Sequence, residues 1–266
     1  IQTSASFGQR KAAIETVLRE QPQVGWSLLL ALLPHSHGST SGCYRSVWRD
    51  FIPRDWREEV LQSEWIEQIT TLTELALDLA MESFEKLAEL INRFSDLPGF
   101  AHDAIMRHLS SDCVVNRPES ERLPIWERLN GLVRRHRKFS DAKWAFPEEA
   151  VAKIDELASL LEPSTPQLKY QHFFNHRDFE LYEEKGNYEE QRKRLELRRQ
   201  EAVLEILTKG SLTDCLAFAA NVAFPYEVGN ALGCIASADV EAAILPTLLS
   251  SDDDSEKLVV AGYVSA

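Results

Sequence analysis

The segment SEWIEQITTLTELALDLAMESFEKLAELINRF, residues 63–94, shows the pattern on which the fold prediction depends. Apolar side chains recur along it every three or four residues, at Trp65, Ile69, Leu72, Ala76 and Leu79, and then at Phe84, Leu87, Ile91 and Phe94. Because an α-helix turns once every 3.6 residues, this spacing puts each set on one helical face. Ser63 is predicted to cap the first helix, since its hydroxyl can accept a backbone N–H. The segment therefore predicts two amphipathic helices that bury their apolar faces.

The rest of the chain carries the same helical signals. Residues 188–209 are predicted to form one long charged helix that ends at Gly210. Pro124 and Pro147 are predicted to open two further helices, and residues 111–121, rich in Ser, Asp, Asn and Pro, to form a loop. Apolar and polar residues nowhere alternate as they would in a half-buried strand. The predicted fold class is therefore all-α.

We expect this all-α chain to be an irregular antiparallel helical bundle that passes into stacked helix pairs of HEAT or TPR type, an α-solenoid. A bundle-like segment with an ordered loop at 34–56 is predicted for residues 1–162. The long helix and short HEAT-like pairs are predicted for residues 163–266. The sequence EPSTPQ at 162–167 marks the boundary, because Pro and Ser cluster there.

The charge of the chain limits its partners. The 266 residues carry a formal net charge of -13, which opposes bulk, non-specific DNA binding because a phosphate backbone attracts a basic surface. Basic residues nevertheless cluster in two runs: Arg128, Arg134, Arg135, Arg137 and Lys138, and then Arg192, Lys193, Arg194, Arg198 and Arg199. Each run is interpreted either as a solvated helix face or as a local site for an acidic partner. Nucleic acid could bind only through these local basic patches.

The hydropathy and the cysteines of the chain bear on where the protein is located in the cell. The longest apolar stretch, residues 24–33, is shorter than the ~20 residues that a membrane helix needs, and no signal peptide precedes it. We therefore predict no membrane contact and a cytoplasmic protein. The four cysteines form no C-x-x-C pair and are expected to be buried free thiols: Cys43, Cys113, Cys215 and Cys234. Because the chain begins with Ile rather than Met, we expect it to be a piece of a longer protein.

Sequence motifs for catalysis are absent. The chain has no G-x-x-x-x-G-K-[ST] or G-x-G-x-x-G loop for a phosphate and no G-x-S-x-G turn for a serine nucleophile. Two sets are candidate metal ligands: His35, His37 and Cys43, and His172, His176 and Asp178. Neither has a complete donor set at a recognisable spacing. We therefore predict no catalytic residue, no metal site and no cofactor. In VGNALG, Gly229 and Gly233 are predicted to allow close contact between helices rather than to hold a phosphate.

An aromatic and charged segment, WRDFIPRDW, occupies residues 48–56. One interpretation is structural, with the tryptophans anchoring a loop on the helical body. The other is a recognition surface formed by Trp48, Arg49 and Trp56, because Trp and Arg are enriched in binding hot spots. The candidate binding residues of the chain are therefore these three and the basic run Arg134, Arg135, Arg137 and Lys138.

Three stretches resemble a known family: REQPQVGWSLLLALLP at 19–34, VWRDF at 47–51 and IWERLNGLVRRHRKFSDAKWAFP at 125–147. They are similar to the C-terminal helical region of large bacterial STAND-type NTPases, which are NLR-like and act in antiphage defence. The resemblance covers roughly residues 9 to 235. It implies ligand sensing in defence against phage, with oligomerisation of the parent protein activating its effector. The NTPase motifs of that family are absent here, so the resemblance implies no hydrolysis by this segment.

The main functional hypothesis is a non-catalytic helical-repeat segment that senses a protein or nucleic-acid trigger through its surface. The alternative is a structural scaffold that positions neighbouring domains. A third hypothesis, with weaker support, is a histidine-based metal-dependent hydrolase.

Overall fold

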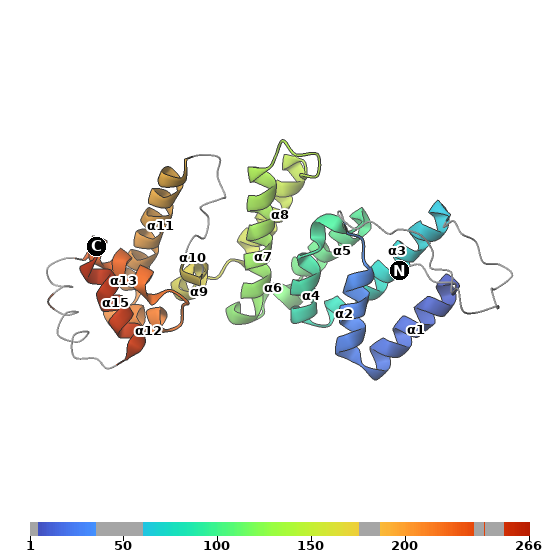
Figure 1. The fold of residues 1–266 in the computed structure, drawn as a ribbon, viewed down its shortest axis with the longest axis horizontal. Coiled ribbons are helices and arrows are strands. Elements are labelled where there is room, and N and C mark those ends of the chain that lie inside the picture. Colours follow the sequence, from blue (N-terminus) through green and yellow to red (C-terminus); the bar gives the residue numbers. More distant parts are fainter. Residues whose placement is uncertain (1–4, 36–60, 176–186, 237–241, 243–252) are drawn as a thin grey trace, which may run out of the picture. The chain divides into compact units, whose positions relative to one another are not determined.

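The computed structural model describes most of the chain: residues 5–35, 61–175, 187–236, 242 and 253–266. Every regular element in these ranges is a helix (Figure 1), so the all-α prediction is confirmed. The chain divides into two compact units, residues 1–116 (unit 1) and 117–266 (unit 2). The boundary predicted between residues 162 and 163 falls inside unit 2 and stays a prediction.

Unit 1 is built from neighbouring helices that pack in sequence order. It contains α1 (Phe7–Glu20), α2 (Pro22–Leu32), α3 (Gln62–Met81), α4 (Phe84–Ile91), the 3-10 helix η1 (Phe94–Asp96), α5 (Gly99–Leu109) and α6 (Asp112–Val115). A capping box starts α1, in which the side chains and backbone N–H groups of Ser6 and Gln9 bond reciprocally. Gly25 lets α2 approach α1, because a Cβ there would lie 2.6 Å from the Cα atom of Leu18.

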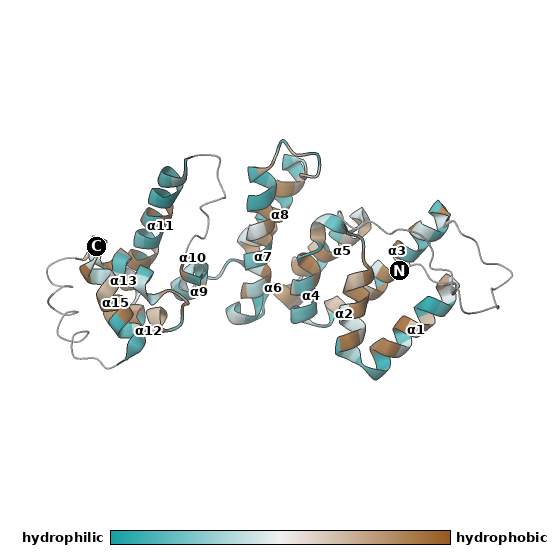
Figure 2. Ribbon diagram, in the orientation of Figure 1, coloured by the Kyte–Doolittle hydropathy of each residue, from teal (hydrophilic) through white to brown (hydrophobic). Residues whose placement is uncertain are grey.

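The apolar segment at residues 24–33 is a core helix, as the hydropathy of α2 in Figure 2 shows. Leu29 of α2 is completely buried. Trp26 is also buried, and its indole N–H donates a 2.6 Å hydrogen bond to a carboxylate oxygen of Glu89 on α4. Burial of an aromatic ring with its polar atom satisfied contributes both apolar area and a directional contact. This pair therefore ties α2 to α4.

The start of α3 differs from the prediction. The helix begins at Gln62 with Leu61 at the N-cap, so Ser63 lies inside its first turn and does not cap it. The carboxylate of Glu64 accepts the backbone N–H of Leu61 at 3.4 Å. A carboxylate in the first turn is favourable because the N-terminus of a helix carries partial positive charge. The predicted apolar face is confirmed at Leu72 and Ala76, which are buried, but it is wrong at Trp65, which is 56% exposed.

Unit 2 begins with a helical hairpin and continues into a second group of helices. It contains α7 (Glu119–Lys138), α8 (Glu148–Leu161), α9 (Pro166–Tyr170), α10 (His172–Asn175), α11 (Tyr188–Lys209), α12 (Leu212–Ala220), α13 (Pro225–Ile235) and α15 (Asp254–Val264). The predicted long helix and its stop at Gly210 are confirmed by α11. Phe174 is fully buried at the centre of the core that α11, α12, α13 and α15 form around it.

The region before α7 is more helical than predicted. Residues 112–115 form α6, and α7 begins at Glu119, so the predicted loop at 111–121 and the predicted start at Pro124 are both wrong. Pro124 lies within the helix and lacks the N–H that would bond to the preceding turn. Two acidic residues in the first turn, Glu119 and Glu121, favour the earlier start through the helix dipole.

The glycines of VGNALG bring two helices into close contact. A Cβ on Gly229 of α13 would lie 2.0 Å from the carbonyl oxygen of Val259 on α15, and one on Gly262 of α15 would lie 2.0 Å from that of Tyr226. A Cβ on Gly233 would lie 2.6 Å from the carbonyl oxygen of Tyr263. The predicted contact between helices is therefore confirmed, and it is closer than any larger side chain allows.

None of the described helices combines the length and the apolar character that crossing a membrane requires.

Candidate functional site

The end of α7 carries the predicted basic run and packs against the connection to α8. His136 is almost fully buried at this end. Its Nδ1 accepts the backbone N–H of Phe146 at 2.9 Å, and the two rings stack with centroids 4.2 Å apart. The ring of Trp144 meets His136 edge-on at 5.5 Å. The connection is thereby held against the helix by one imidazole.

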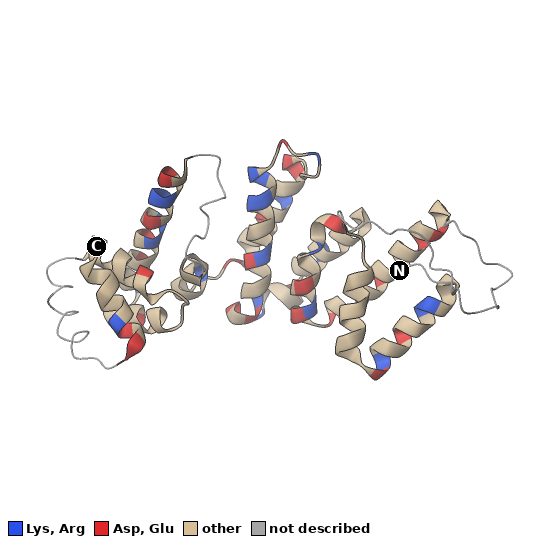
Figure 3. Ribbon diagram, viewed as in Figure 1, with Lys and Arg blue, Asp and Glu red and all other residues tan. Residues whose placement is uncertain are grey.

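Two cations of the run lie over aromatic rings that solvent reaches. The guanidinium carbon of Arg135 is 4.9 Å from the centroid of the Trp144 ring, and the ammonium of Lys138 is 5.3 Å from that of Phe139. Trp144 is 44% exposed and Phe139 is 43% exposed. We call these four residues the basic–aromatic surface. Figure 3 shows the Lys and Arg residues gathered at this end of α7.

Arg137, also in the predicted run, has a different environment. Its guanidinium forms an ion pair with Asp155 of α8 at 2.8 Å and a longer one with Glu148 at 3.4 Å. The hydrogen bond to Asp155 is the largest cause that raises the pKa of Arg137 above its ordinary value. Arg137 therefore holds α8 against α7.

The second basic run was interpreted as a solvated face or as a site for an acidic partner, and the burial of Arg199 contradicts both interpretations for this residue. It is only 4% exposed. Its guanidinium pairs with Glu227 of α13 at 2.7 Å, and its Nε donates to the carbonyl oxygen of Phe173 at 3.0 Å. The spacing of apolar residues along α11 could have predicted this burial, because Arg199 lies on the same helical face as Leu195, Ala202 and Ile206.

His172 of the second candidate metal set packs among aromatic rings. Its ring centroid lies 5.3 Å from that of Trp126 and 4.3 Å from that of Phe173. Burial, followed by the positive charge of Arg134 and a smaller effect of Arg198, lowers the pKa of His172 to about 3. The imidazole is therefore neutral at physiological pH, and it packs α10 against Trp126 of α7.

Other candidate residues lie outside the described residues. Trp48, Arg49 and Trp56 do so, and so do the remaining metal candidates His37, Cys43, His176 and Asp178. His35 is described, and its Nδ1 is 4.0 Å from a carboxylate oxygen of Asp96. Within the described ranges, no three His, Cys, Asp or Glu side chains are grouped closely enough to hold a metal ion.

The three cysteines that the structure describes differ in their exposure. Cys215 is fully buried, and burial raises the pKa of its thiol to about 12. Cys113 and Cys234 are exposed free thiols, so the expectation that all cysteines are buried is wrong for these two. They lie on the outer sides of short helical segments, where the apolar pattern is too brief to assign a face.

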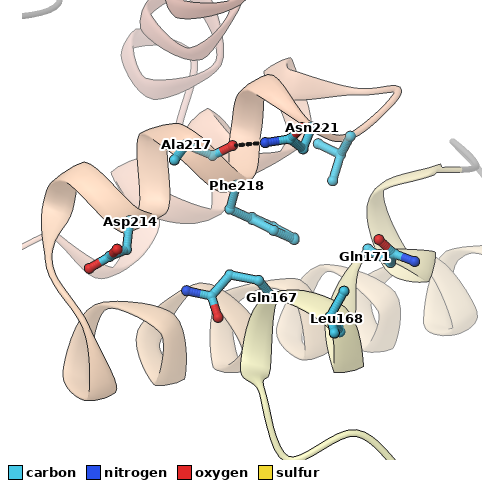
Figure 4. Close-up of a pocket in the computed structure, with 8 residues that line it drawn as sticks. Gln167, Leu168, Gln171, Asp214, Ala217, Phe218 and Asn221 are labelled. Atoms are coloured by element: carbon cyan, nitrogen blue, oxygen red, sulfur yellow. Dashed lines mark hydrogen bonds between the residues drawn. The ribbon is translucent and has the colours of Figure 1, made fainter. Parts of the chain in front are cut away.

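A pocket that the sequence did not indicate lies between α9 and α12 (Figure 4). Its volume is about 400 Å³. Phe218 and Val222 are buried at its floor, and the polar side chains that line it are Gln167, Gln171, Asp214 and Asn221. Because these residues come from segments more than 40 positions apart in the chain, no local spacing rule could have grouped them.

Comparison with family models, with curated proteins and with solved structures gave no match for this chain.

Proposed function

We propose that this chain is a non-catalytic interaction segment of a large STAND-type bacterial NTPase, and that it binds an acidic trigger through the basic–aromatic surface. The observation that supports the proposal most directly is the pairing of Arg135 with Trp144 and of Lys138 with Phe139, both at rings that are more than two-fifths exposed. Arg and Trp dominate binding hot spots, because they combine a large contact area with a polar group.

Contacts outside the basic–aromatic surface also join α7 to α8. The ion pairs of Arg137 with Asp155 and Glu148 and the hydrogen bond of His136 to Phe146 already make that connection. An exposed aromatic ring beneath a cation gains more when a partner excludes water from both, since cation–π attraction rises as the pair is desolvated. A partner that covers the basic–aromatic surface would therefore strengthen both cation–π pairs.

The proposed biological setting comes from the resemblance of residues 19–34, 47–51 and 125–147 to the STAND-type family. In that setting the segment is cytoplasmic, requires no cofactor, and transmits trigger binding to the NTPase module of the parent, whose oligomerisation activates an effector. The trigger is a protein with an acidic face or a nucleic acid. The alternative, a scaffold without a ligand, predicts that the basic–aromatic surface contributes nothing to binding.

The test is a paired charge reversal, Arg135→Glu with Lys138→Glu. Two labelled probes, oligothymidylate and polyglutamate, are titrated by fluorescence anisotropy at an ionic strength of about 0.15 M, where weak surface charge effects are screened. We expect at least one probe to bind and to lose about tenfold or more in affinity. A matched control, Lys11→Glu with Lys257→Glu, makes the same charge change at two exposed i,i+4 and i,i+3 ion pairs and should alter affinity less than about twofold.

Two further results separate the hypotheses. Loss of oligothymidylate binding in Trp144→Ala would favour nucleic acid, because bases stack on exposed aromatic rings. Equal affinity of the wild type and the double reversal for both probes would contradict the proposal and favour a scaffold. The coding sequence on both sides of the segment tests the family: a phosphate-binding G-x-x-x-x-G-K-[ST] loop upstream supports the NTPase parent.

A further inference from the structure

The pocket between α9 and α12 has an apolar floor and a polar rim. Phe218 points into it from α12, and Leu168 faces it from α9 (Figure 4). About 400 Å³ is within the range of ~300–1,000 Å³ that ligand sites occupy. An apolar floor with a few polar groups around it is the usual composition of such a site.

The rim is formed mainly of side-chain amides, which match the hydrogen-bonding groups of a peptide backbone. Nδ2 of Asn221 donates to the carbonyl oxygen of Ala217 at 2.7 Å, so its amide oxygen remains to accept a bond from a ligand. Gln171 makes one long bond, 3.5 Å from its Nε2 to Glu127. A side-chain amide supplies a hydrogen-bond donor and an acceptor and carries no charge. A peptide unit has the same properties.

The spacing of the rim amides also fits an extended chain. Gln167 of α9 and Gln171, the C-cap residue that follows α9 in α-helical conformation, are four residues apart, which corresponds to a rise of about 6 Å along the helix axis. Equivalent groups of an extended chain recur every two residues, about 6.8 Å apart. Two glutamines at this spacing can therefore contact alternate peptide groups of one bound strand.

On the α12 side of the pocket, Ala217 leaves space for a ligand and Asp214 contributes a negative charge. Ala217 lies between Asp214 and Asn221 on the exposed face of the helix, and its small side chain leaves the pocket open. Asp214 accepts bonds from the backbone N–H and the hydroxyl of Ser211, at 2.8 and 2.7 Å, and brings a negative charge to one end. That charge disfavours phosphate-rich ligands and favours a cationic side chain.

We propose that this pocket binds a short extended peptide from a partner protein. In the bound state the amides of Gln167, Gln171 and Asn221 bond to the peptide backbone, an apolar side chain packs on Phe218, and a Lys or Arg side chain lies at the Asp214 end. The inference does not depend on the proposed function, because the pocket selects a cationic peptide and shares no residue with the basic–aromatic surface.

The experiment is selection of a displayed library of short random peptides on the immobilised full chain, followed by affinity measurement of the enriched peptides. Ala217→Leu fills the pocket from an exposed helical position. Ala220→Leu is the matched control, since Ala220 is also exposed on α12 and does not line the pocket. We expect affinity to fall at least tenfold in Ala217→Leu and to change less than twofold in Ala220→Leu, with both variants retaining the helical circular dichroism of the wild type.

Asp214→Asn tests the charge, because asparagine keeps an oxygen that can accept the bonds from Ser211. We expect the enriched peptides to share a basic residue and to bind this variant several-fold more weakly. Failure to enrich any peptide, or equal affinity for Ala217→Leu and Ala220→Leu, would overturn the proposal. Enriched peptides without a shared basic residue, whose binding Asp214→Asn leaves unchanged, would overturn the role of Asp214.

Discussion

Phe146 donates its backbone N–H to Nδ1 of His136 over 2.9 Å, while the two rings stack at a centroid distance of 4.2 Å. The bond requires that Nδ1 carry no proton, so only a neutral imidazole can make it. Burial, and to a smaller extent the positive charge of Arg135, lowers the pKa of His136 below its ordinary value of 6.5. The end of α7 therefore depends on a neutral histidine.

The first prediction concerns the pH dependence of stability. Since the folded state holds the pKa of His136 below 6.5, the unfolded chain takes up the proton first as pH falls. The stabilisation that neutral His136 contributes is fully present above about pH 6.5. It declines as pH falls from there through the pKa of His136 in the folded state. We expect the loss of unfolding free energy between about pH 7.5 and pH 5.5, measured by urea denaturation, to be smaller in His136→Gln than in the wild type.

The variant His136→Gln should also be less stable than the wild type at neutral pH. Gln cannot reproduce the ring stacking with Phe146 and places its acceptor differently, so we expect a loss of about 1–3 kcal/mol in unfolding free energy at pH 7.5. An identical pH dependence in His136→Gln and the wild type would contradict the role assigned to this histidine.

The second prediction concerns the contact of α13 with α15. Gly229→Ala would place a Cβ 2.0 Å from the carbonyl oxygen of Val259, a distance at which the two helices must separate. We expect a loss of at least about 2 kcal/mol in unfolding free energy. Gly131→Ala is the control: a Cβ there meets nothing within 4 Å, so the better helix former should stabilise α7 by about 0.5–1 kcal/mol. Similar effects of the two variants would show that the close approach is not maintained in solution.

The third prediction concerns the buried ion pair of α11 with α13. The side chains of Arg199 and Glu227 are 5% and 19% exposed, and removing either leaves the other charge without compensation. We expect Arg199→Met and Glu227→Gln each to cost about 3 kcal/mol, and the double variant to cost clearly less than the sum.

An exposed pair on the same helix provides the comparison for this cycle. Arg192 and Glu196 lie 3.0 Å apart with side chains 64% and 40% exposed, and Arg192→Ala should cost less than about 0.5 kcal/mol in chemical denaturation. Additive losses in the Arg199–Glu227 cycle would mean that the two charges do not stabilise each other.

The fourth prediction concerns the start of α7. The carboxylate of Glu119 accepts bonds from the hydroxyl and N–H of Ser164 and from the N–H of Thr165. These bonds, those of Ser164 foremost, lower the pKa of Glu119 from 4.5 to about 2. The resulting stability is present above about pH 4.5 and is lost as pH falls through about 2.

We therefore expect Glu119→Ala to lower the unfolding free energy by about 1 kcal/mol at neutral pH, with a smaller difference from the wild type at about pH 3. Glu121→Ala is the control, since Glu121 occupies the same first turn and pairs with the exposed Arg117 at 3.6 Å instead of bonding to residues 164 and 165. If Glu121→Ala destabilises as much, then the helix dipole, and not the bonds to residues 164 and 165, explains the effect.

Much of the fold was predictable because helical periodicity is a local property. The N–H of each residue bonds four positions back, so the apolar spacing at Leu72 and Ala76 predicted a buried face without knowledge of its partner. Gly210 as the end of α11 and the glycines of VGNALG as a contact surface were predictable for the same reason. The start of α7 was missed, because Pro118 and Pro124 both suit the beginning of a helix and sequence alone does not choose between them.

The candidate sites were predictable only in part. The run of basic residues at 134–138 predicts positive charge there, but the direction of each side chain depends on the residues that surround it in the fold. Arg137 turns to Asp155 of α8, and Arg135 lies over Trp144. The pocket between α9 and α12 combines short segments that carry no pattern of their own.

Composition and residue spacing within about two helical turns predict a chain that is helical, acidic and without a recognisable catalytic motif. The burial of Arg199 beside Glu227, the bond between His136 and Phe146, and the position of Gln167 on α9 opposite α12 across a pocket are visible in the folded chain alone. Each of these depends on packing between segments distant in the chain. Such packing is selected by side-chain shape and charge in three dimensions, and a linear pattern does not contain it.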